Sequence, residues 1–112
     1  MRNTAELKQN NMLSLIQTVY AARAATKPEL AKLLNLTIPT VHNFISELVA
    51  RNIVIENGMD DSRGGRRAVR YSFNGNLYHI LAVRVTPQRI DIGLFDMLLN
   101  CVKKDQYRVD LD

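Results

Sequence analysis

The sequence predicts an α+β fold in which three helices and a β-hairpin precede a three-stranded antiparallel meander. Apolar residues recur at helical spacing as far as about residue 50, and from residue 53 they occur instead in short runs rich in β-branched side chains. A polar segment that contains glycine separates the first two of these runs. We therefore divide the 112 residues into a helix and hairpin domain, 1–76, and a strand-rich segment, 77–112.

The first predicted helix begins at Asn3. Asn3 and Glu6 stand three residues apart, the spacing at which two side chains cap the free N–H groups of a first turn. The apolar face of this helix continues to about Arg23 through Leu7, Met12, Leu15, Ile16, Val19 and Tyr20.

The second predicted helix, Pro28–Leu34, has a stronger start signal. The run Thr26-Lys-Pro-Glu29 combines a capping threonine, an early proline and a glutamate at the third helical position. Asn35 follows the helix at the place where a left-handed residue commonly ends one. We expect this helix to bury its four apolar side chains, Leu30, Ala31, Leu33 and Leu34.

The third predicted helix lies within Leu36–Asn52 and is amphipathic. Thr37 can cap it, and Pro39 fits a first turn, where the missing N–H has no intrahelical use. The side expected to face the core carries Val41, Phe44, Ile45, Leu48 and Val49. Taken alone, this is equally the pattern of an ordinary surface helix. A short helix, a tight turn and a second helix with a polar N-terminal end together indicate a helix-turn-helix.

The predicted hairpin has strongly basic residues between its strands. Its strands are Ile53–Glu56 and Ala68–Phe73, joined by the loop 57–67. Residues 1–76 contain ten Lys or Arg and six Asp or Glu, whereas residues 77–112 contain five of each, so the net charge of +4 belongs to the first domain. Four arginines fall in the acid-free window 62–70, and such a patch attracts nucleic acids. Three helices and a basic hairpin form a winged helix-turn-helix, with 57–67 as the wing.

Residues 77–112 predict three strands joined by short turns. The runs are Tyr78–Val85, Arg89–Phe95 and Leu99–Val109, an order that favours an antiparallel meander. Cys101 is the single cysteine, and we expect it to be a buried structural thiol. An isolated meander has an exposed face and edges, so it must pack on the first domain, pair with another copy or belong to a longer chain.

Several short motifs add a family resemblance. They are Glu29-Leu-Ala31, Leu36-Thr37, Thr40-Val41, Ile53-Val-Ile-Glu56 and above all Ser62-Arg-Gly-Gly-Arg-Arg67. In these motifs the chain resembles, over about residues 7–110, the N-terminal DNA-binding domain of the ROK family (repressors, open reading frames and kinases), in its branch of sugar-responsive transcriptional repressors. The resemblance implies that 77–112 is the start of a truncated actin-like effector domain, and that a sugar effector binds only if the missing part is present.

We expect DNA contacts from three groups of residues. Recognition-helix contacts are expected from Thr37, Ile38, Pro39, Thr40, His42 and Asn43, contacts that position phosphates from Thr26 and Lys27, and wing contacts from Arg63, Gly64, Gly65, Arg66 and Arg67. Asn43 is the best candidate for reading a base, because asparagine pairs bidentately with adenine. The alternatives are a solvated histidine at 42, an Ile38 that fills space between helices, and a wing that is a solvated loop.

Neither catalysis nor a cofactor is expected. Asp91 and Gly93 superficially resemble the Asp-x-Gly phosphate motif of actin-like kinases, but that motif closes the first strand, where this chain has Arg84-Val-Thr86. We therefore expect Asp91 and Asp96 to be exposed strand and turn residues. No metal site is expected, because neither histidine has a second ligand at suitable spacing.

The sequence as a whole predicts a sequence-specific DNA-binding transcriptional regulator, and the family resemblance implies a repressor of sugar-metabolism genes. We expect a homodimer on a palindromic double-stranded operator, located in the cytoplasm and without a membrane partner, because the chain shows neither a signal-peptide core nor a bilayer-spanning run. Two alternatives are a winged-helix module for protein interaction or dimerisation and a non-catalytic sugar kinase fragment.

Overall fold

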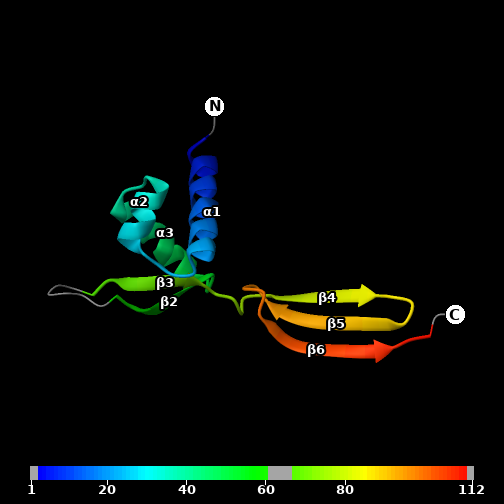
Figure 1. The fold of residues 1–112 in the computed structure, drawn as a ribbon. Helices are drawn as coiled ribbons and strands as arrows, with labels where there is room; N and C mark the ends of the chain where they lie inside the picture. Colours follow the sequence, from blue (N-terminus) through cyan, green and yellow to red (C-terminus); the bar gives the residue numbers. More distant parts are fainter. Residues whose placement is uncertain (1–2, 61–66, 111–112) are drawn as a thin grey trace. The chain divides into compact units, whose positions relative to one another are not determined.

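A computed structural model describes residues 3–60 and 67–110 of the chain (Figure 1). It contains three α-helices and two three-stranded antiparallel sheets, which confirms the predicted α+β class. The chain divides into two compact units, Met1–Asn74 and Gly75–Asp112, called unit 1 and unit 2 below.

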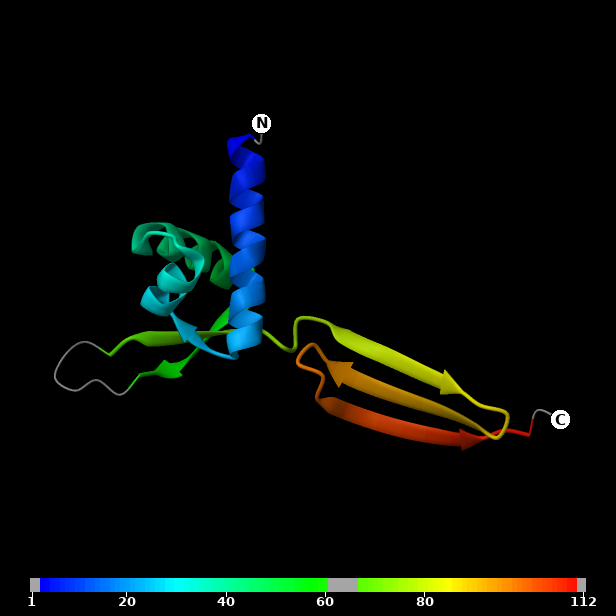
Figure 2. The same cartoon turned by 45° about the horizontal axis from the view of Figure 1, so that its top comes forward.

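Unit 1 contains all the helices and one of the sheets. Helix α1 packs against α2 and β3, and α3 packs against α2 and β2. In both ribbon views the helices lie on one side of the β2–β3 hairpin (Figure 1, Figure 2). The sheet order is β1-β3-β2. The elements are α1 (Thr4–Ala22), β1 (Ala25–Thr26), α2 (Lys27–Leu34), α3 (Ile38–Ala50), β2 (Val54–Met59) and β3 (Val69–Phe73).

The helices of unit 1 begin and end at the predicted signals. The Asn3 side chain accepts a hydrogen bond from the N–H of Glu6 at 2.7 Å. Thr26 and Glu29 form a complete capping box before α2. Asn35 ends that helix with a left-handed backbone at φ 54°. Local sequence therefore determines these boundaries, since each signal acts within a few residues of its own position.

The core of unit 1 lies between the three helices and β3. Its buried apolar side chains are Leu15, Val19, Ala25, Leu30, Ala31, Val41, Phe44, Ile45, Leu48, Val54, Tyr71 and Phe73. Two side chains that α2 was expected to bury are missing from it, because Leu33 is 66% exposed and Leu34 is only half-buried. At 3.6 residues per turn, Leu33 points roughly 100° away from the centre of the stripe formed by Leu30, Ala31 and Leu34. The prediction that α2 buries all four apolar residues is therefore wrong at Leu33 and holds only in part at Leu34.

The hairpin strands extend further than the sequence pattern indicated. Strand β2 continues to Met59, so Asn57 and Gly58, expected to open the loop, lie within the strand. Between Glu56 and Met59 the register shifts, and two residues of β2 stand opposite Arg70 alone. Gly58 has φ 78°, a left-handed value that glycine adopts without strain. The residues that the sequence pattern indicated as a turn therefore form a β-bulge within β2, and the connection between β2 and β3 begins after Met59.

Unit 2 is an antiparallel meander of β4 (His79–Val85), β5 (Arg89–Asp96) and β6 (Cys101–Arg108), in the order β4-β5-β6. Cys101 is exposed at the start of β6, and the expectation of a buried thiol is therefore wrong. All the side chains of this strand are exposed, and no second layer covers them within the described residues of unit 2. In the described parts of the chain, no helix has the length and apolar character needed to span a lipid bilayer.

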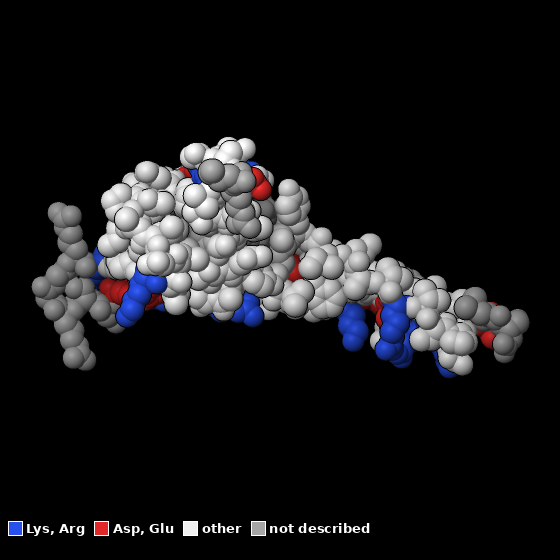
Figure 3. Space-filling model, turned by 90° about the horizontal axis from the view of Figure 1, so that it is seen from above, with Lys and Arg blue, Asp and Glu red and all other residues white. Residues whose placement is uncertain are grey.

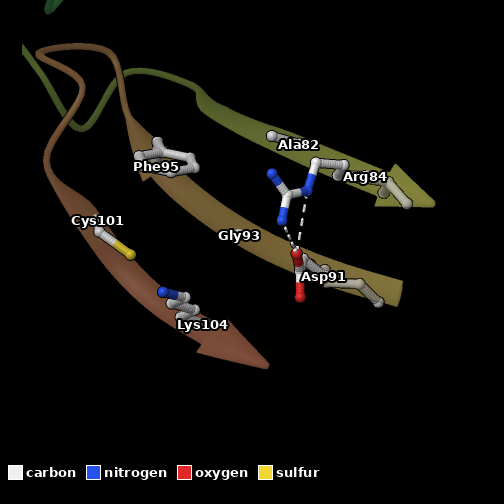
Figure 4. Close-up of a pocket in the computed structure, with 9 residues that line it drawn as sticks. Ala82, Arg84, Asp91, Gly93, Phe95, Cys101 and Lys104 are labelled. Carbon is white, nitrogen blue, oxygen red and sulfur yellow. Dashed lines mark hydrogen bonds and ion pairs between the residues drawn. The ribbon is translucent and has the colours of Figure 1, made fainter. Parts of the chain in front are cut away.

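The strand register of unit 2 creates two different sheet faces. One, called the aliphatic face, carries Leu81, Val83, Val85, Ile90, Ile92 and Leu94. Its β4 members are 65%, 56% and 62% exposed in that order. The other face carries charged residues beside Phe95 and Cys101, as Figure 4 shows. An apolar face of this kind is normally packed against other apolar groups.

Candidate nucleic-acid interface

The N-terminal half of α3 presents most of the predicted recognition residues on the surface. Thr37, Ile38, Pro39, His42 and Asn43 are all exposed. Helix packing explains this, because the opposite stripe of α3 is buried in the core of unit 1. The exposure of Ile38 also rejects the alternative that it fills space between helices.

Thr40 is the member of this group that is partly withdrawn from the surface. Its side chain is half-buried, and its hydroxyl lies 2.8 Å from that of Thr37. The Thr37 hydroxyl in turn accepts a hydrogen bond from the backbone N–H of Thr40 at 3.3 Å. These contacts fix the first turn of α3 and its two threonine side chains.

Lys27 joins the beginning of α2 to the exposed face of α3. Its ammonium nitrogen lies 2.8 Å from Nδ1 of His42. The same ammonium lies 5.4 Å from the centre of the Tyr71 ring, within the range of a cation–π contact. The fold thus brings together a predicted phosphate-binding lysine and a predicted recognition-helix residue. His42 is therefore not simply solvated, because it accepts a contact from a second element.

Thr26 takes a different role from the predicted one. It is 3% exposed, and its hydroxyl accepts a hydrogen bond from the N–H of Glu29 at 3.3 Å. The N–H of Thr26 donates to the Glu29 carboxylate at 3.2 Å. A side chain this buried cannot approach a phosphate directly. The prediction of a phosphate contact by Thr26 is corrected to a capping role.

The predicted wing is described at its base. Arg67 is exposed just before β3. The other predicted wing residues, Arg63, Gly64, Gly65 and Arg66, lie outside the described residues. The arginine window 62–70 contains no acid in sequence. At the base of the wing, however, acids from elsewhere in the chain approach this window in the fold.

Arg70 is the arginine in contact with these acids. Its guanidinium donates to Asp60 at 2.7 Å, to Glu29 at 3.3 Å and to the carbonyl oxygen of Ala24 at 2.9 Å. Its side chain is 29% exposed. The hydrogen bond to Asp60 is the main cause of a pKa of Arg70 above its ordinary value. Arg70 therefore serves an internal network and does not add a free positive charge to the surface.

The charge on the rest of unit 1 is unevenly distributed. In the space-filling view, residues other than Lys, Arg, Asp and Glu cover most of its visible face, and the charged side chains that are visible lie near its margins (Figure 3). The exposed N-terminal half of α3 contains no Asp or Glu, and the ammonium of Lys27 contacts it at His42. A polar and acid-free helix end can approach a polyanion without electrostatic repulsion.

The Asp-x-Gly segment of unit 2 is occupied by internal contacts. Asp91 forms ion pairs with Arg84 at 3.0 Å (Figure 4) and with Arg89 at 2.8 Å. Its side chain is 18% exposed, so the expectation of an exposed residue is wrong there. The Phe95 ring fills the space in which a side chain at Gly93 would stand, 2.7 Å from its Cβ position. Across residues 3–60 and 67–110, no three His, Cys, Asp or Glu side chains gather closely enough to hold a metal ion.

Asp96 closes the turn between β5 and β6. Its carboxylate accepts hydrogen bonds from the Asn100 side chain and from the N–H groups of Leu98 and Asn100, at 2.9–3.0 Å. These bonds, chiefly the one from the Asn100 side chain, hold the pKa of Asp96 below its ordinary value. Asp96 is the last residue of β5 and is half-buried, so the expectation of an exposed residue is wrong here too.

Two repressors are similar to this chain in sequence. A putative xylose repressor from Caldicellulosiruptor sp. (strain Rt8B.4) is 36% identical over 98 residues, which cover 88% of this chain and 25% of that protein. A xylose repressor from Caldicellulosiruptor bescii is 32% identical over 94 residues, which cover 84% of this chain and 24% of that protein. The chain thus spans about a quarter of the length of these relatives.

A solved structure is similar in fold. It is the crystal structure of a ROK family transcriptional regulator, a homologue of the E. coli MLC protein, with a TM-score of 0.62 and 17% identity. The match covers 92% of this chain and 26% of that one, and at this identity it concerns the fold alone. No family model matches the chain.

Proposed function

Because this chain belongs to the ROK family of repressors, we propose that it carries the DNA-binding part of a transcriptional repressor of sugar-metabolism genes. Residues 1–76 are then a winged helix-turn-helix domain, with α2 and α3 as the helix-turn-helix and the β2–β3 hairpin as the wing. Helix α3 enters the major groove, and the arginines of the wing contact the minor groove or its phosphates.

The observation that carries this proposal is the exposed N-terminal half of α3. Its polar side chains stand on a helix whose other side is anchored in the core, so they are held rigidly. Asn43 reads a base edge, and Thr37 and His42 contact neighbouring bases or phosphates. Lys27, held beside His42, neutralises a backbone phosphate.

Operator geometry follows from dimerisation. We propose that two copies bind a palindromic operator whose half-sites lie about 34 Å apart, or a multiple of that distance, since each α3 must meet the same groove face. The operator contacts of each copy come from unit 1. Unit 2 then links unit 1 to the part of the repressor that senses a sugar.

Residues 77–112 are, in this proposal, the first strands of an actin-like effector domain. The aliphatic face supports it, because six large apolar side chains share one sheet face that no other described part of unit 2 covers. A sugar effector would bind the remainder of that domain. The internal contacts of Asp91 and Gly93 leave this segment without a phosphate site of its own.

Selection of bound sequences from a random DNA library tests the proposal. We expect a conserved palindrome with half-sites one helical turn, or a multiple of it, apart. Fluorescence anisotropy on the selected DNA should show log K falling with log salt by about 0.9 per phosphate neutralised. Recovery of random sequence, together with weak and salt-insensitive binding, would instead support a protein-interaction module.

The wing is tested by the double variant Arg66→Ala/Arg67→Ala. Its affinity and its salt slope should both fall, because about two phosphate or minor-groove contacts are removed. The matched control is Arg84→Ala/Arg108→Ala in unit 2, which removes the same charge away from the proposed interface. Equal effects of the two double variants would show that the wing makes no specific contact.

A further inference from the structure

Arg70 connects three separate parts of unit 1. Asp60 directly follows β2, Glu29 lies in the first turn of α2, and Ala24 precedes β1. The distances from the guanidinium to these partners are 2.7, 3.3 and 2.9 Å. An arginine can serve several acceptors at once because its planar group carries five N–H donors in a fixed arrangement.

The backbone places Arg70 where these parts meet. On one side Arg70 pairs in register with Thr26, the N-cap of α2, and on the other it stands opposite the β-bulge of β2. Beyond the bulge, the N–H of Asp60 bonds to the carbonyl oxygen of Ala68 at 2.8 Å, which is the last described backbone bond before the connection. Asp60 and Arg70 thus lie at the base of the hairpin, beside the start of the helix-turn-helix.

Electrostatics alone would disfavour acids at this place. Asp60 and Glu29 lie beside the window 62–70, which carries the concentrated positive charge of the chain. Near DNA, each carboxylate reduces the positive potential and should weaken binding. The contact of these carboxylates with Arg70 holds the hairpin base in one position, and this ordering offsets the loss in DNA binding.

We propose that Arg70, with Asp60 and Glu29, is a positioning network that fixes the direction in which the wing leaves the helix-turn-helix. The inference rests on the proposed function, because it assigns the network a role in DNA binding. Arg70 itself is not a DNA contact. It orients the segment that carries the wing arginines, so that they and α3 engage the same stretch of duplex.

The variant Asp60→Asn separates this role from simple charge. It raises the net charge by one, so charge alone predicts tighter binding. Positioning predicts the opposite, a loss of about fivefold or more in operator affinity and a salt slope smaller by about one, because a wing contact is lost. The matched control is Glu56→Gln, which removes an exposed carboxylate from β2, the strand that ends just before Asp60.

The expected outcome is weaker operator binding by Asp60→Asn, unchanged or tighter binding by Glu56→Gln, and similar melting temperatures for both. Arg70→Lys, which keeps the charge but loses the planar fork, should behave like Asp60→Asn. Binding by Asp60→Asn that equals or exceeds that of the control would overturn the positioning role while leaving the proposed function intact. Failure of the unaltered chain to bind any selected DNA would overturn the proposed function itself.

Discussion

Replacement of Asn43 by alanine tests direct base readout with little effect on the fold. Asn43 is exposed on α3, so its removal leaves no cavity. Alanine is the better helix former, by up to about 0.7 kcal/mol, and the variant should therefore be at least as stable as the parent. Any loss of binding then arises at the interface and not from unfolding.

The expected loss is confined to one base pair. A bidentate contact between asparagine and adenine is worth about 1–3 kcal/mol of discrimination, which corresponds to roughly 5-fold to 150-fold in affinity. Anisotropy titrations against the selected operator, and against operators changed at single base pairs, measure this directly. Asn43→Ala should bind all four bases equally at one position of each half-site and keep its preferences elsewhere.

Ser46→Ala is the matched control, one turn further along α3. Its hydroxyl donates to the carbonyl oxygen of His42 at 2.8 Å, so it is engaged within the helix. Its replacement should leave base preference unchanged. Equal losses by Asn43→Ala on operator and random DNA, or no loss at all, would refute the assignment of direct readout to Asn43.

Three further predictions concern stability and the sheet of unit 2. Leu48→Ala removes a fully buried side chain and should lower the free energy of unfolding by about 2–5 kcal/mol in urea titrations, whereas Leu33→Ala at an exposed site should change it little. Asp96 has a lowered pKa, so the stabilisation that its ionised carboxylate provides is present above the ordinary carboxyl pKa and is lost as the pH falls through the pKa of Asp96 in the folded protein. Asp96→Asn should therefore lose part of the acid dependence of unfolding. An unchanged dependence of unfolding on pH would contradict this. Val83→Lys should reduce binding of an apolar dye to the aliphatic face, while Gln106→Lys on the opposite face should not, and equal dye binding by both would show that this face is not the dye site.

The parts of unit 1 that the sequence predicted are those determined by neighbouring residues. The caps at Asn3, Thr26 and Thr37 act over three residues, and the buried stripe of α3 follows from its own periodicity. The extent of β2 was not predicted, because the bulge interrupts the alternation by which a strand is recognised. Gly58 and its preceding asparagine form a turn signal in sequence and a bulge in the fold.

The parts that were missed depend on residues far apart in the chain. Arg70 was grouped with the wing arginines because no acid is near it in sequence, yet Glu29, 41 residues earlier, reaches it in the fold. The burial of Thr26 likewise depends on pairing with β3. One sequence signal was available for the network, since Asp60 lies two residues before the acid-free window 62–70. For Cys101, the pattern of a strand did not reveal that this strand would lack a covering layer.

The two carboxylate oxygens of Glu29 couple the folding of α2 to that of the hairpin. One oxygen accepts the N–H of Thr26 and so starts α2, and the other accepts the guanidinium of Arg70 at the base of the hairpin. The start of this helix and the closure of the hairpin therefore share one carboxylate and should form or be lost together. Hydrogen exchange at the Thr26 amide would then report on opening of the hairpin, and substitutions at Thr26 and Asp60 should be non-additive in a double-mutant cycle.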